Sequence, residues 1–320
     1  MAQSIAIFSL GSNDALAKKI ADRIGVPLGK VKLKTFSDGE QYVQFEENIR
    51  GRNVFLIQST NPPAENWVRL FIALDAARGA SAKEVTVVLP YFGYARQERK
   101  SKPREAISAR TFSMLLDTLG ADHLLTMDLH TDSIGGFFRK ANVDYLYARP
   151  VFIRHFKEFF KKELAEDRLV VVSPDVGGAA RAQSYAKRLM QRADLAIIHK
   201  ERELPNQVAK VRLAGDVNGK VALIIDDMLD TCGTLAKASE LLKNSGATAV
   251  YAAATHGVLS GPANERIDNA PVEKVFITDT ITPERALSSK IEVISVGEIF
   301  GDAIKRIQTD ESLSELFESD

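Results

Sequence analysis

The chain has 320 residues, of which 45% are hydrophobic and 26% are charged, and these ordinary values exclude a disordered or fibrous protein. Its 42 Lys and Arg residues balance its 42 Asp and Glu residues, so no overall field draws it to nucleic acid or to an anionic membrane. A single cysteine excludes a disulfide framework, and the only apolar run near the start is too short for a signal core or a membrane span, so we expect a cytoplasmic protein.

The first predicted elements are a buried strand over 5–10 and a helix that begins after Asn13 and ends at Gly25. Asn13 is a typical N-cap, apolar residues follow it at helical spacing, and glycine commonly ends a helix. Further apolar runs, which predict strands, alternate with helix-like segments and lie at 54–57, 85–89, 124–127, 169–172, 195–198, 221–225 and 250–254. This alternation predicts an α/β fold built on parallel sheets.

The plan of the chain from Val54 repeats from Val221. In both copies a strand, a loop and a helix lead to a Gly-Ala pair that starts 25 residues further along, at Gly79 and at Gly246. Each pair leads directly into another apolar strand. The repeat predicts a duplication, with two related α/β domains over 1–148 and 149–320.

The strongest candidate site is the acidic loop after the strand 221–225. The first copy has Ser59, Thr60 and Pro63 where the second copy has three aspartates. Backbone N–H groups and threonine hydroxyls at a helix start suit a phosphate, and carboxylates at a strand end suit the hydroxyls of a sugar. The alternative is a loop whose polar residues only cap the helix. The candidate residues are Asp226, Asp227, Asp230, Thr231, Cys232, Gly233 and Thr234.

Two other strand ends carry polar residues. Asp128 and His130 stand two positions apart after the strand 124–127, so their side chains point the same way. Asp175 follows the strand 169–172 in a loop with two glycines, where a ligand can approach the backbone. A lone histidine is more often structural and Asp175 also suits a helix cap, so a structural alternative stays open for both.

Three further segments carry charge or a turn without a decisive local pattern. Asp38 and Gly39 lie between two apolar, alternating runs and predict a hairpin turn. Five cations over 96–104 predict a solvated face rather than a nucleic-acid patch, because no aromatic residues interleave them. Lys200 and Arg202 precede a stretch without periodicity that could close over a substrate, although ordinary surface charge is the alternative.

Taken together, these segments resemble the ribose-phosphate pyrophosphokinases, also called phosphoribosyl pyrophosphate synthetases. The similar segments occur in the family's order and are 36–40, 94–100, 107–110, 128–130, 173–178, 200–202, 226–234 and 255–257. The resemblance implies transfer of the pyrophosphoryl group of Mg-ATP to the anomeric hydroxyl of ribose 5-phosphate, which gives phosphoribosyl pyrophosphate and AMP for nucleotide biosynthesis. It also implies two phosphoribosyltransferase-like domains, each a mainly parallel sheet flanked by helices.

The resemblance places the ATP contacts in the domain 1–148, beside a degenerate phosphate loop. The tip of the hairpin would enter the ATP site of a neighbouring subunit, and a segment after a later strand would hold the nucleotide. An oligomer, with dimers assembled into a hexamer, would therefore be needed for activity. The residues assigned to ATP in this way are Phe36, Asp38, Gly39, Glu40, Arg96 and Gln97.

The resemblance places the sugar site and the catalytic loop in the domain 149–320. The loop 226–234 would bind ribose 5-phosphate, and Lys200 and Arg202 would stabilise charge on the transferring group. The magnesium ligands implied by the family are His130, Asp175 and Asp128. ATP and ribose 5-phosphate are the expected partners, with no nucleic acid and no membrane.

The chain departs from the family pattern shortly after His130. Ser133 stands where the family commonly has Gln, Arg139 where it has Asp, and Ala141 near a family Pro. These changes leave Asp128 and His130 in place, but they weaken the case for a further cation site in this segment.

Two alternatives to an active synthetase stay open. A phosphoribosyltransferase that consumes phosphoribosyl pyrophosphate would share the loop 226–234, but it has no reason to keep Asp38, Arg96 and His130. A non-catalytic regulatory subunit of such a synthetase would keep the fold, but it need not keep Lys200 and the complete acidic loop.

Overall fold

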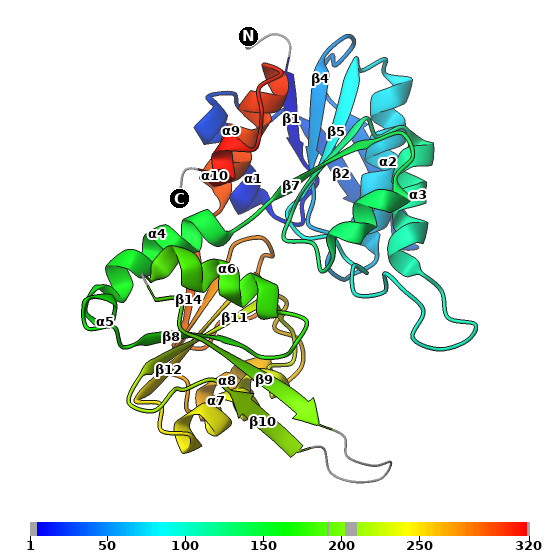
Figure 1. The fold of residues 1–320 in the computed structure, drawn as a ribbon. Helices are drawn as coiled ribbons and strands as arrows, with labels where there is room; N and C mark the ends of the chain where they lie inside the picture. The colour runs from blue at the N-terminus through cyan, green and yellow to red at the C-terminus, as the bar shows by residue number, and fades with distance from the viewer. Residues whose placement is uncertain (1–4, 191, 202–209, 319–320) are drawn as a thin grey trace. The chain divides into compact units, whose positions relative to one another are not determined.

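The computed structural model describes residues 5–190, 192–201 and 210–318, which divide into two compact units (Figure 1). Unit 1 contains residues 5–147, 280–282 and 295–318, and unit 2 contains the described residues of 148–279 together with 283–294. The chain therefore passes between the units more than once. The division at 147–148 lies next to the expected boundary, but the range 149–320 does not coincide with unit 2, because its C-terminal part packs on unit 1.

Unit 1 is built on a five-stranded sheet in which every neighbouring pair is parallel. Its strands are, in spatial order, β1 (Ile5–Ser9), β4 (Asn53–Ile57), β5 (Glu84–Leu89), β6 (His123–Met127) and β7 (Asn142–Leu146). Between β1 and β4 the chain forms a separate antiparallel pair, β2 (Val31–Thr35) and β3 (Gln41–Phe45). The buried residues of β1, β4, β5 and β6 are almost all apolar, as expected for a parallel sheet covered on both faces.

Helices cover both faces of the unit 1 sheet (Figure 1). One pair, α2 (Glu65–Gly79) and α3 (Ser108–Leu119), lies on one face, and the pair α1 (Asp14–Ile24) and α9 (Gly297–Gln308) lies on the other. A 3-10 helix, η1 (Asp132–Phe137), connects β6 to β7, and a short helix, α10 (Glu315–Glu318), follows α9. Trp67 of α2 is 2% exposed and packs against the rings of Phe92 and Phe112, with centroids 5.2 and 4.5 Å away.

The helix predicted between Asn13 and Gly25 is present as α1, and its ends follow from local chemistry. The Asn13 side chain accepts a hydrogen bond from the Leu16 N–H at 3.2 Å, which satisfies one donor of the first turn. Gly25 has φ +81°, a left-handed conformation that glycine adopts at low cost, and its N–H donates to Ala21 O at 2.9 Å.

Helix α9 packs closely on α1 although nearly the whole chain separates them in sequence. A Cβ atom at Gly301 would lie 2.7 Å from the Arg23 Cβ, so only glycine permits this approach. Two hydrogen bonds of 2.8 Å join the Arg23 guanidinium to the Asp302 carboxylate, and the pKa of Arg23 is raised mainly by that hydrogen bonding. These contacts place the C-terminal segment in unit 1.

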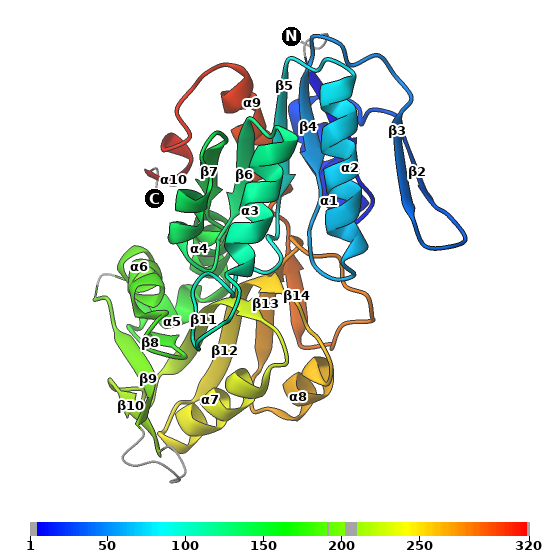
Figure 2. The same cartoon turned by 90° about the vertical axis from the view of Figure 1, so that its right-hand side faces the viewer.

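Unit 2 contains a seven-stranded sheet (Figure 2). All its neighbouring strands are parallel except β9 and β10, which are antiparallel. In spatial order the strands are β10 (Lys210–Ala214), β9 (Leu195–Glu201), β8 (Leu169–Ser173), β11 (Val221–Leu229), β12 (Ala249–Gly257), β13 (Lys274–Thr278) and β14 (Ile291–Ile294).

Helices also cover both faces of this second sheet (Figures 1 and 2). One face carries α4 (Arg149–Phe159) and α6 (Ala179–Leu189), with the short α5 (Lys161–Ala165) after α4. The other face carries α7 (Gly233–Asn244) and α8 (Ala263–Asn269). Among the residues that the structure describes, no helix is long and apolar enough to cross a bilayer.

The two units share one strand plan. The order β1-β4-β5-β6-β7 of unit 1 corresponds to the order β8-β11-β12-β13-β14 of unit 2. In each unit, two strands follow the helix that comes after the first strand, α1 in unit 1 and α6 in unit 2. In unit 1 those two strands form their own sheet, whereas in unit 2 they extend the main sheet beside β8. The predicted α/β class, with two mainly parallel sheets flanked by helices, is confirmed.

Candidate functional site

The acidic loop lies at the carboxyl end of β11 and leads directly into α7. The strand is buried over 221–225, and the chain then turns through 230–232 before α7 begins at Gly233. Cys232 has the left-handed φ +57°, which is uncommon for a residue with a Cβ, and its carbonyl accepts from the Ala236 N–H at 3.0 Å. The first N–H groups of a helix have no intrahelical acceptor, so this turn presents donors and the positive end of a helix dipole.

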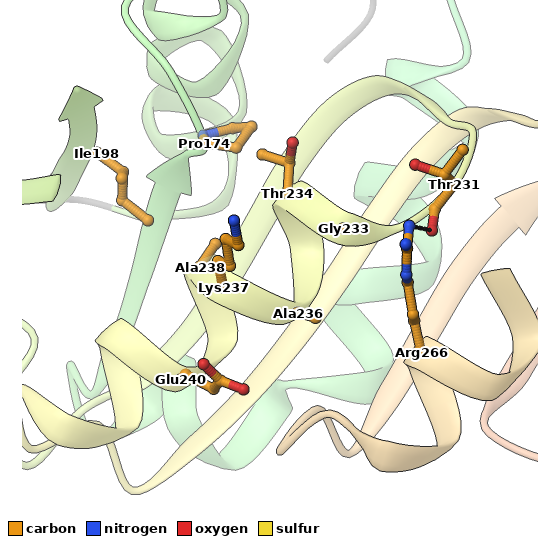
Figure 3. A pocket seen from close by; sticks show the side chains of 10 residues that line it. All are labelled: Pro174, Ile198, Thr231, Gly233, Thr234, Ala236, Lys237, Ala238, Glu240 and Arg266. Atoms are coloured by element: carbon orange, nitrogen blue, oxygen red, sulfur yellow. Dashed lines mark hydrogen bonds between the residues drawn. The ribbon is translucent and has the colours of Figure 1, made fainter. Parts of the chain in front are cut away.

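A pocket of about 550 Å³ opens beside this turn (Figure 3). The turn residues contribute to it from the start of α7, and Arg266 reaches it from α8, donating from Nη1 to Thr231 O at 2.8 Å. All the lining residues belong to unit 2, and they are Pro174, Ile198, Thr231, Gly233, Thr234, Ala236, Lys237, Ala238, Glu240 and Arg266.

Asp226 and Asp227 form a close pair of carboxyl groups at the end of β11. The Asp227 side chain is only 7% exposed, and the Asp227 N–H donates to Asp226 Oδ1 at 2.8 Å. Burial, followed by the hydrogen bond and the negative charge of Asp227, raises the pKa of Asp226 to about 8. The pair is therefore suited to hold or exchange a proton near neutral pH.

A cation, Arg181 on α6, faces this pair. Its Nη1 lies 3.4 Å from Asp227 Oδ1 and 3.7 Å from Asp226 Oδ1, and its charge lowers the pKa of Asp226 against the larger effect of burial. Arg181 was not predicted from the sequence. The only local signal is its place in the first turn of the helix that follows the Asp175 loop.

Cys232 does not have the properties of a nucleophile. The residue is 5% exposed, and burial, with a smaller effect of the Asp230 charge, raises the pKa of its thiol to about 12. Because the thiolate is the reactive form, this cysteine stays unreactive near neutral pH. Its contribution to the turn is the backbone conformation.

Asp175 lies in the loop between β8 and α6, where its side chain bonds within the loop instead of capping the helix. Its Oδ1 accepts from the Gly178 N–H at 2.8 Å, directly before α6, and its carbonyl accepts from the Ser173 hydroxyl at 2.6 Å. The bond to Gly178 stabilises the loop just before α6, and no side chain caps the first turn of that helix. The Asp175 side chain is nevertheless exposed, so a carboxylate oxygen can still be approached from solvent.

The hairpin predicted at Asp38 and Gly39 is present between β2 and β3. The Phe36 N–H donates to Glu40 O at 2.8 Å, and the Glu40 N–H donates to Asp38 Oδ1 at 3.1 Å. Gly39 has φ +97°, which favours glycine. Phe36 is 41% exposed and lies edge-on to Tyr42 with centroids 5.9 Å apart, so the tip presents an aromatic face.

Arg96 and Gln97 lie on the long connection from β5 to α3, and both side chains are exposed. The Ser108 hydroxyl donates to Gln97 Oε1, and the Ala109 N–H donates to Gln97 O at 3.3 Å, which ties this connection to the start of α3. The basic run 96–104 thus forms part of a solvated surface, as the sequence predicts.

Asp128 and His130 directly follow β6. Asp128 has φ +40°, an uncommon conformation for a residue that is not glycine, and its N–H donates to Leu146 O at 2.9 Å. Its side chain is half-buried, and that of His130 is exposed. A strand end held in this way presents polar groups at the carboxyl edge of the unit 1 sheet.

The segment that departs from the family pattern is anchored by a buried aspartate, Asp117 of α3. Its carboxylate accepts from the N–H groups of Arg139 at 2.6 Å, Lys140 at 3.3 Å and Ala141 at 3.0 Å. Ser133 lies in η1 and donates its N–H to Thr131 Oγ1 at 3.4 Å. These bonds use backbone N–H groups, so they hold the β6–β7 connection without depending on the side chains of Arg139 and Ala141.

Lys200 lies on β9, where its backbone pairs with Val211 of β10. Arg202 lies outside the described residues. In the first copy of the duplication, Ser59 and Thr60 occupy the positions of Asp226 and Asp227, and they are buried and bonded within unit 1, with the Ser59 hydroxyl donating to Thr280 O at 2.6 Å. Unit 1 therefore has no equivalent of the acidic pair at these two positions.

The structure brings some of the predicted site residues together. The seven residues of the acidic loop form one continuous strand end, turn and helix start. Asp128 and His130 belong to unit 1 and Asp175 to unit 2. Over 5–190, 192–201 and 210–318, no three His, Cys, Asp or Glu side chains converge as a metal site.

Two protein-family models match separate parts of the chain. The model of the N-terminal domain of ribose phosphate pyrophosphokinase matches residues 5–120. The model of the phosphoribosyl synthetase-associated domain matches residues 198–318.

Similar proteins match over almost the full length. The ribose-phosphate pyrophosphokinase of Chlorobaculum tepidum is 48% identical over 319 residues, which are 100% of this chain and 97% of that protein. The ribose-phosphate pyrophosphokinase of Fusobacterium nucleatum is 46% identical over 316 residues, or 98% of each chain. The crystal structure of phosphoribosylpyrophosphate synthetase from Mycobacterium smegmatis matches with a TM-score of 0.89 and 36% identity, covering 96% of this chain and 99% of that one.

Proposed function

This chain belongs to the ribose-phosphate pyrophosphokinase family, and on that premise we propose which of its residues bind each substrate. The enzyme transfers the pyrophosphoryl group of ATP to ribose 5-phosphate and produces phosphoribosyl pyrophosphate for nucleotide biosynthesis. The observation that carries the assignment of residues is the continuous run from the Asp226–Asp227 pair through the turn 230–232 to the start of α7.

Ribose 5-phosphate binds along this run. The 5-phosphate lies on the turn 231–234, where N–H groups, threonine hydroxyls and the helix dipole favour an anion. The ribose hydroxyls donate to Asp226 and Asp227, because carboxylates accept several hydrogen bonds. The pocket of about 550 Å³ beside the turn is within the size range of small-molecule sites.

ATP binds through residues of unit 1. The adenine stacks on the exposed face of Phe36, and Asp38, Gly39 and Glu40 line the same hairpin tip. Because the tip projects from a two-stranded sheet with its own pairing, it can serve a neighbouring subunit of a homo-oligomer, assembled as dimers into a hexamer. Arg96 and Gln97 contact the nucleotide from the β5–α3 connection, and a guanidinium suits a polyphosphate.

Magnesium is the cation that the family implies, and the residues present fit it in part. The Asp128 and Asp175 carboxylates supply the hard oxygen atoms that Mg²⁺ prefers, at two strand ends, whereas the His130 imidazole is an unusual ligand for it. Asp175 uses one oxygen for the Gly178 N–H and retains acceptor capacity for a cation or its water. When bound, magnesium neutralises charge on the polyphosphate.

The protein's part in the reaction is mainly positioning. The anomeric oxygen of ribose 5-phosphate attacks the β-phosphorus of ATP in line with the leaving AMP, so both substrates must be held at fixed separation and angle. Lys200 and Arg202 place positive charge over the transferring group, and Arg96 adds a third cation. Removing one such contact typically costs about 10²- to 10³-fold in turnover.

The test of this function is formation of AMP and phosphoribosyl pyrophosphate from Mg-ATP, followed by mass spectrometry. Both products should depend on ribose 5-phosphate and should not form with unphosphorylated ribose. The Thr234→Ala and Asp226→Asn variants should lose ribose 5-phosphate affinity while their thermal stability is retained. If both products form and the two variants bind ribose 5-phosphate as tightly as the wild type, the sugar site lies elsewhere.

A further inference from the structure

The turn that we assign to the 5-phosphate is held by a separate segment of the chain, residues 259–266, which follows β12. The Leu259 N–H donates to Leu229 O at 2.9 Å. The Ser260 hydroxyl donates to Asp230 Oδ1, and Arg266 Nη1 donates to Thr231 O at 2.8 Å. The last residue of β11 and the first two residues of the turn are thus each bonded to this segment.

This support acts where the turn is least stable by itself. Cys232, the next residue, is held at the left-handed φ +57°, which a residue with a Cβ adopts only when its surroundings enforce it. The bond from Arg266 fixes the peptide group that enters Cys232, so it fixes the direction of the N–H groups that follow. Figure 3 shows Arg266 reaching the turn from α8, separately from the α7 residues.

The charge of Arg266 points to the same conclusion. A Cβ atom at Gly233, the first residue of α7, would lie 3.3 Å from Arg266 Nη1, so the guanidinium lies at the positive end of the α7 dipole. A cation is unfavourable at a helix N-terminus unless an anion joins it there. The Asp230 carboxylate, held by Ser260, is one anion at the turn, and the guanidinium and the dipole together add positive potential there that favours a bound phosphate.

We propose that Arg266 and Ser260 are positioning residues for the phosphate of ribose 5-phosphate. Arg266 holds the turn through Thr231 O and strengthens the positive potential at the start of α7, and Ser260 holds the Asp230 side chain. This inference rests on the proposed function of the turn 231–234. It adds residues that are not part of the acidic loop and that sequence reasoning did not select.

The test compares substrate affinities of the oligomeric enzyme. Arg266→Ala should raise the KM for ribose 5-phosphate about tenfold or more and leave the KM for ATP within about twofold, because a hydrogen bond to a charged group is lost at one site only. Arg266→Lys, which keeps the charge and a donor, should recover part of the loss. Ser260→Ala should act in the same direction, and Ser260→Thr should resemble the wild type.

Two further measurements separate positioning from general stability. Amide hydrogen exchange at 231–235 should become faster in Arg266→Ala while exchange in β12 and β13 stays unchanged, and the melting temperature should fall little. The matched control is Arg168→Ala, which removes an arginine of the same unit that pairs with Glu166. It should change neither KM.

The outcomes are distinguishable. An unchanged KM for ribose 5-phosphate in Arg266→Ala, or an equal rise of both KM values with a large loss of thermal stability, would overturn the inference while leaving the proposed function intact. If calorimetry finds that Thr234→Ala and Asp226→Asn bind ribose 5-phosphate as the wild type does, the turn is not the phosphate site and both proposals fail.

Discussion

The Arg181 guanidinium lies 3.4 Å from the Asp227 carboxylate, which is almost completely buried. Asp226 is its next neighbour at 3.7 Å. The single arginine therefore faces two adjacent carboxyl groups, one of which has a strongly raised pKa. Burial of Asp226 favours its protonated form, and the Arg181 charge opposes that effect and favours the carboxylate that can accept ribose hydroxyls.

Replacing Arg181 with alanine should shift the pH dependence of sugar binding to higher pH. Without the guanidinium, the pKa of Asp226 rises further, because a charge that lowers it is removed. The KM for ribose 5-phosphate near pH 7.5 should rise about tenfold for each unit of that shift and recover as the pH increases. Arg181→Lys is the conservative control. Identical pH profiles for wild type and Arg181→Ala would contradict this role.

The contribution of Asp226 to the stability of the unliganded protein should fall as the pH rises from about 4 to about 8. The Asp226 pKa is 3.8 in a model peptide and about 8 in the folded protein, so the folded state holds a proton that the unfolded state releases over this range. The stabilisation from this proton is complete below pH 3.8, and it is lost as the pH rises through about 8. Urea unfolding at several pH values gives the free energy of unfolding as a function of pH. That free energy should fall less steeply with pH in Asp226→Asn than in the wild type. If the free energy of unfolding depends on pH equally in Asp226→Asn and in the wild type, a group other than Asp226 causes that dependence.

Cys232 should resist alkylation in the folded enzyme. Burial raises the pKa of its thiol to about 12, so almost no thiolate is present at pH 7.5. Iodoacetamide should modify the protein in urea and leave the native protein unmodified, as intact mass spectrometry can measure. Cys232→Ser should remain active. Rapid alkylation without denaturant, accompanied by loss of activity, would indicate a reactive thiol instead.

Enlarging Gly301 should destabilise unit 1. The position of its missing Cβ is 2.6 Å from the Arg23 Cγ, so a larger side chain forces α9 away from α1. Gly301→Leu should lower the free energy of unfolding by about 1–3 kcal/mol, as overpacking usually does. Gly79→Ala is the control, because no atom lies within 4 Å of its Cβ position. Equal denaturation midpoints for Gly301→Leu and the wild type would show that the two helices can separate without cost.

Two inactive variants should restore activity to each other if the hairpin tip serves a neighbouring subunit. Phe36→Ala alters the proposed ATP contact, and Lys200→Ala alters the proposed catalytic contact. After mixed reassembly, some sites combine an intact tip from one chain with an intact Lys200 from the other. Mixing Asp226→Asn with Lys200→Ala is the control and should restore nothing, because both residues are assigned to the same subunit's site. No recovery in the first mixture would place the ATP contacts within one chain.

The parts of the structure that the sequence predicts are those with local causes. Asn13 and Gly25 bound α1 through bonds within the helix, and Asp38 with Gly39 forms the hairpin through bonds within five residues. The acidic loop is equally local, since the end of β11, the turn and the start of α7 are consecutive. In each case the residue type and the contact lie in the same short segment.

The parts that the sequence does not predict depend on contacts between distant segments. Arg266 reaches Thr231 from a short helix beyond β12, and Arg181 reaches Asp227 from α6, with no pattern that distinguishes either from a surface arginine. The local sequence of 295–318 also does not predict that this segment belongs to unit 1. Helix α9 has one apolar side, and that pattern alone does not identify the sheet on which the helix packs. Asp175 also differs from the local expectation of a helix cap, because its carboxylate bonds to Gly178 in the loop before α6.

The packing of α9 on α1 has a consequence for synthesis. The ribosome makes α1 first and α9 after all of unit 2, so the nascent chain must carry an incomplete unit 1 while unit 2 emerges. During that interval the face of α1 that will meet Gly297 and Gly301 has no cover from its final partner. Such a transiently exposed surface is where a chaperone can bind and where newly made chains can aggregate. Completion of the first-made unit is thus coupled to release of nearly the entire chain.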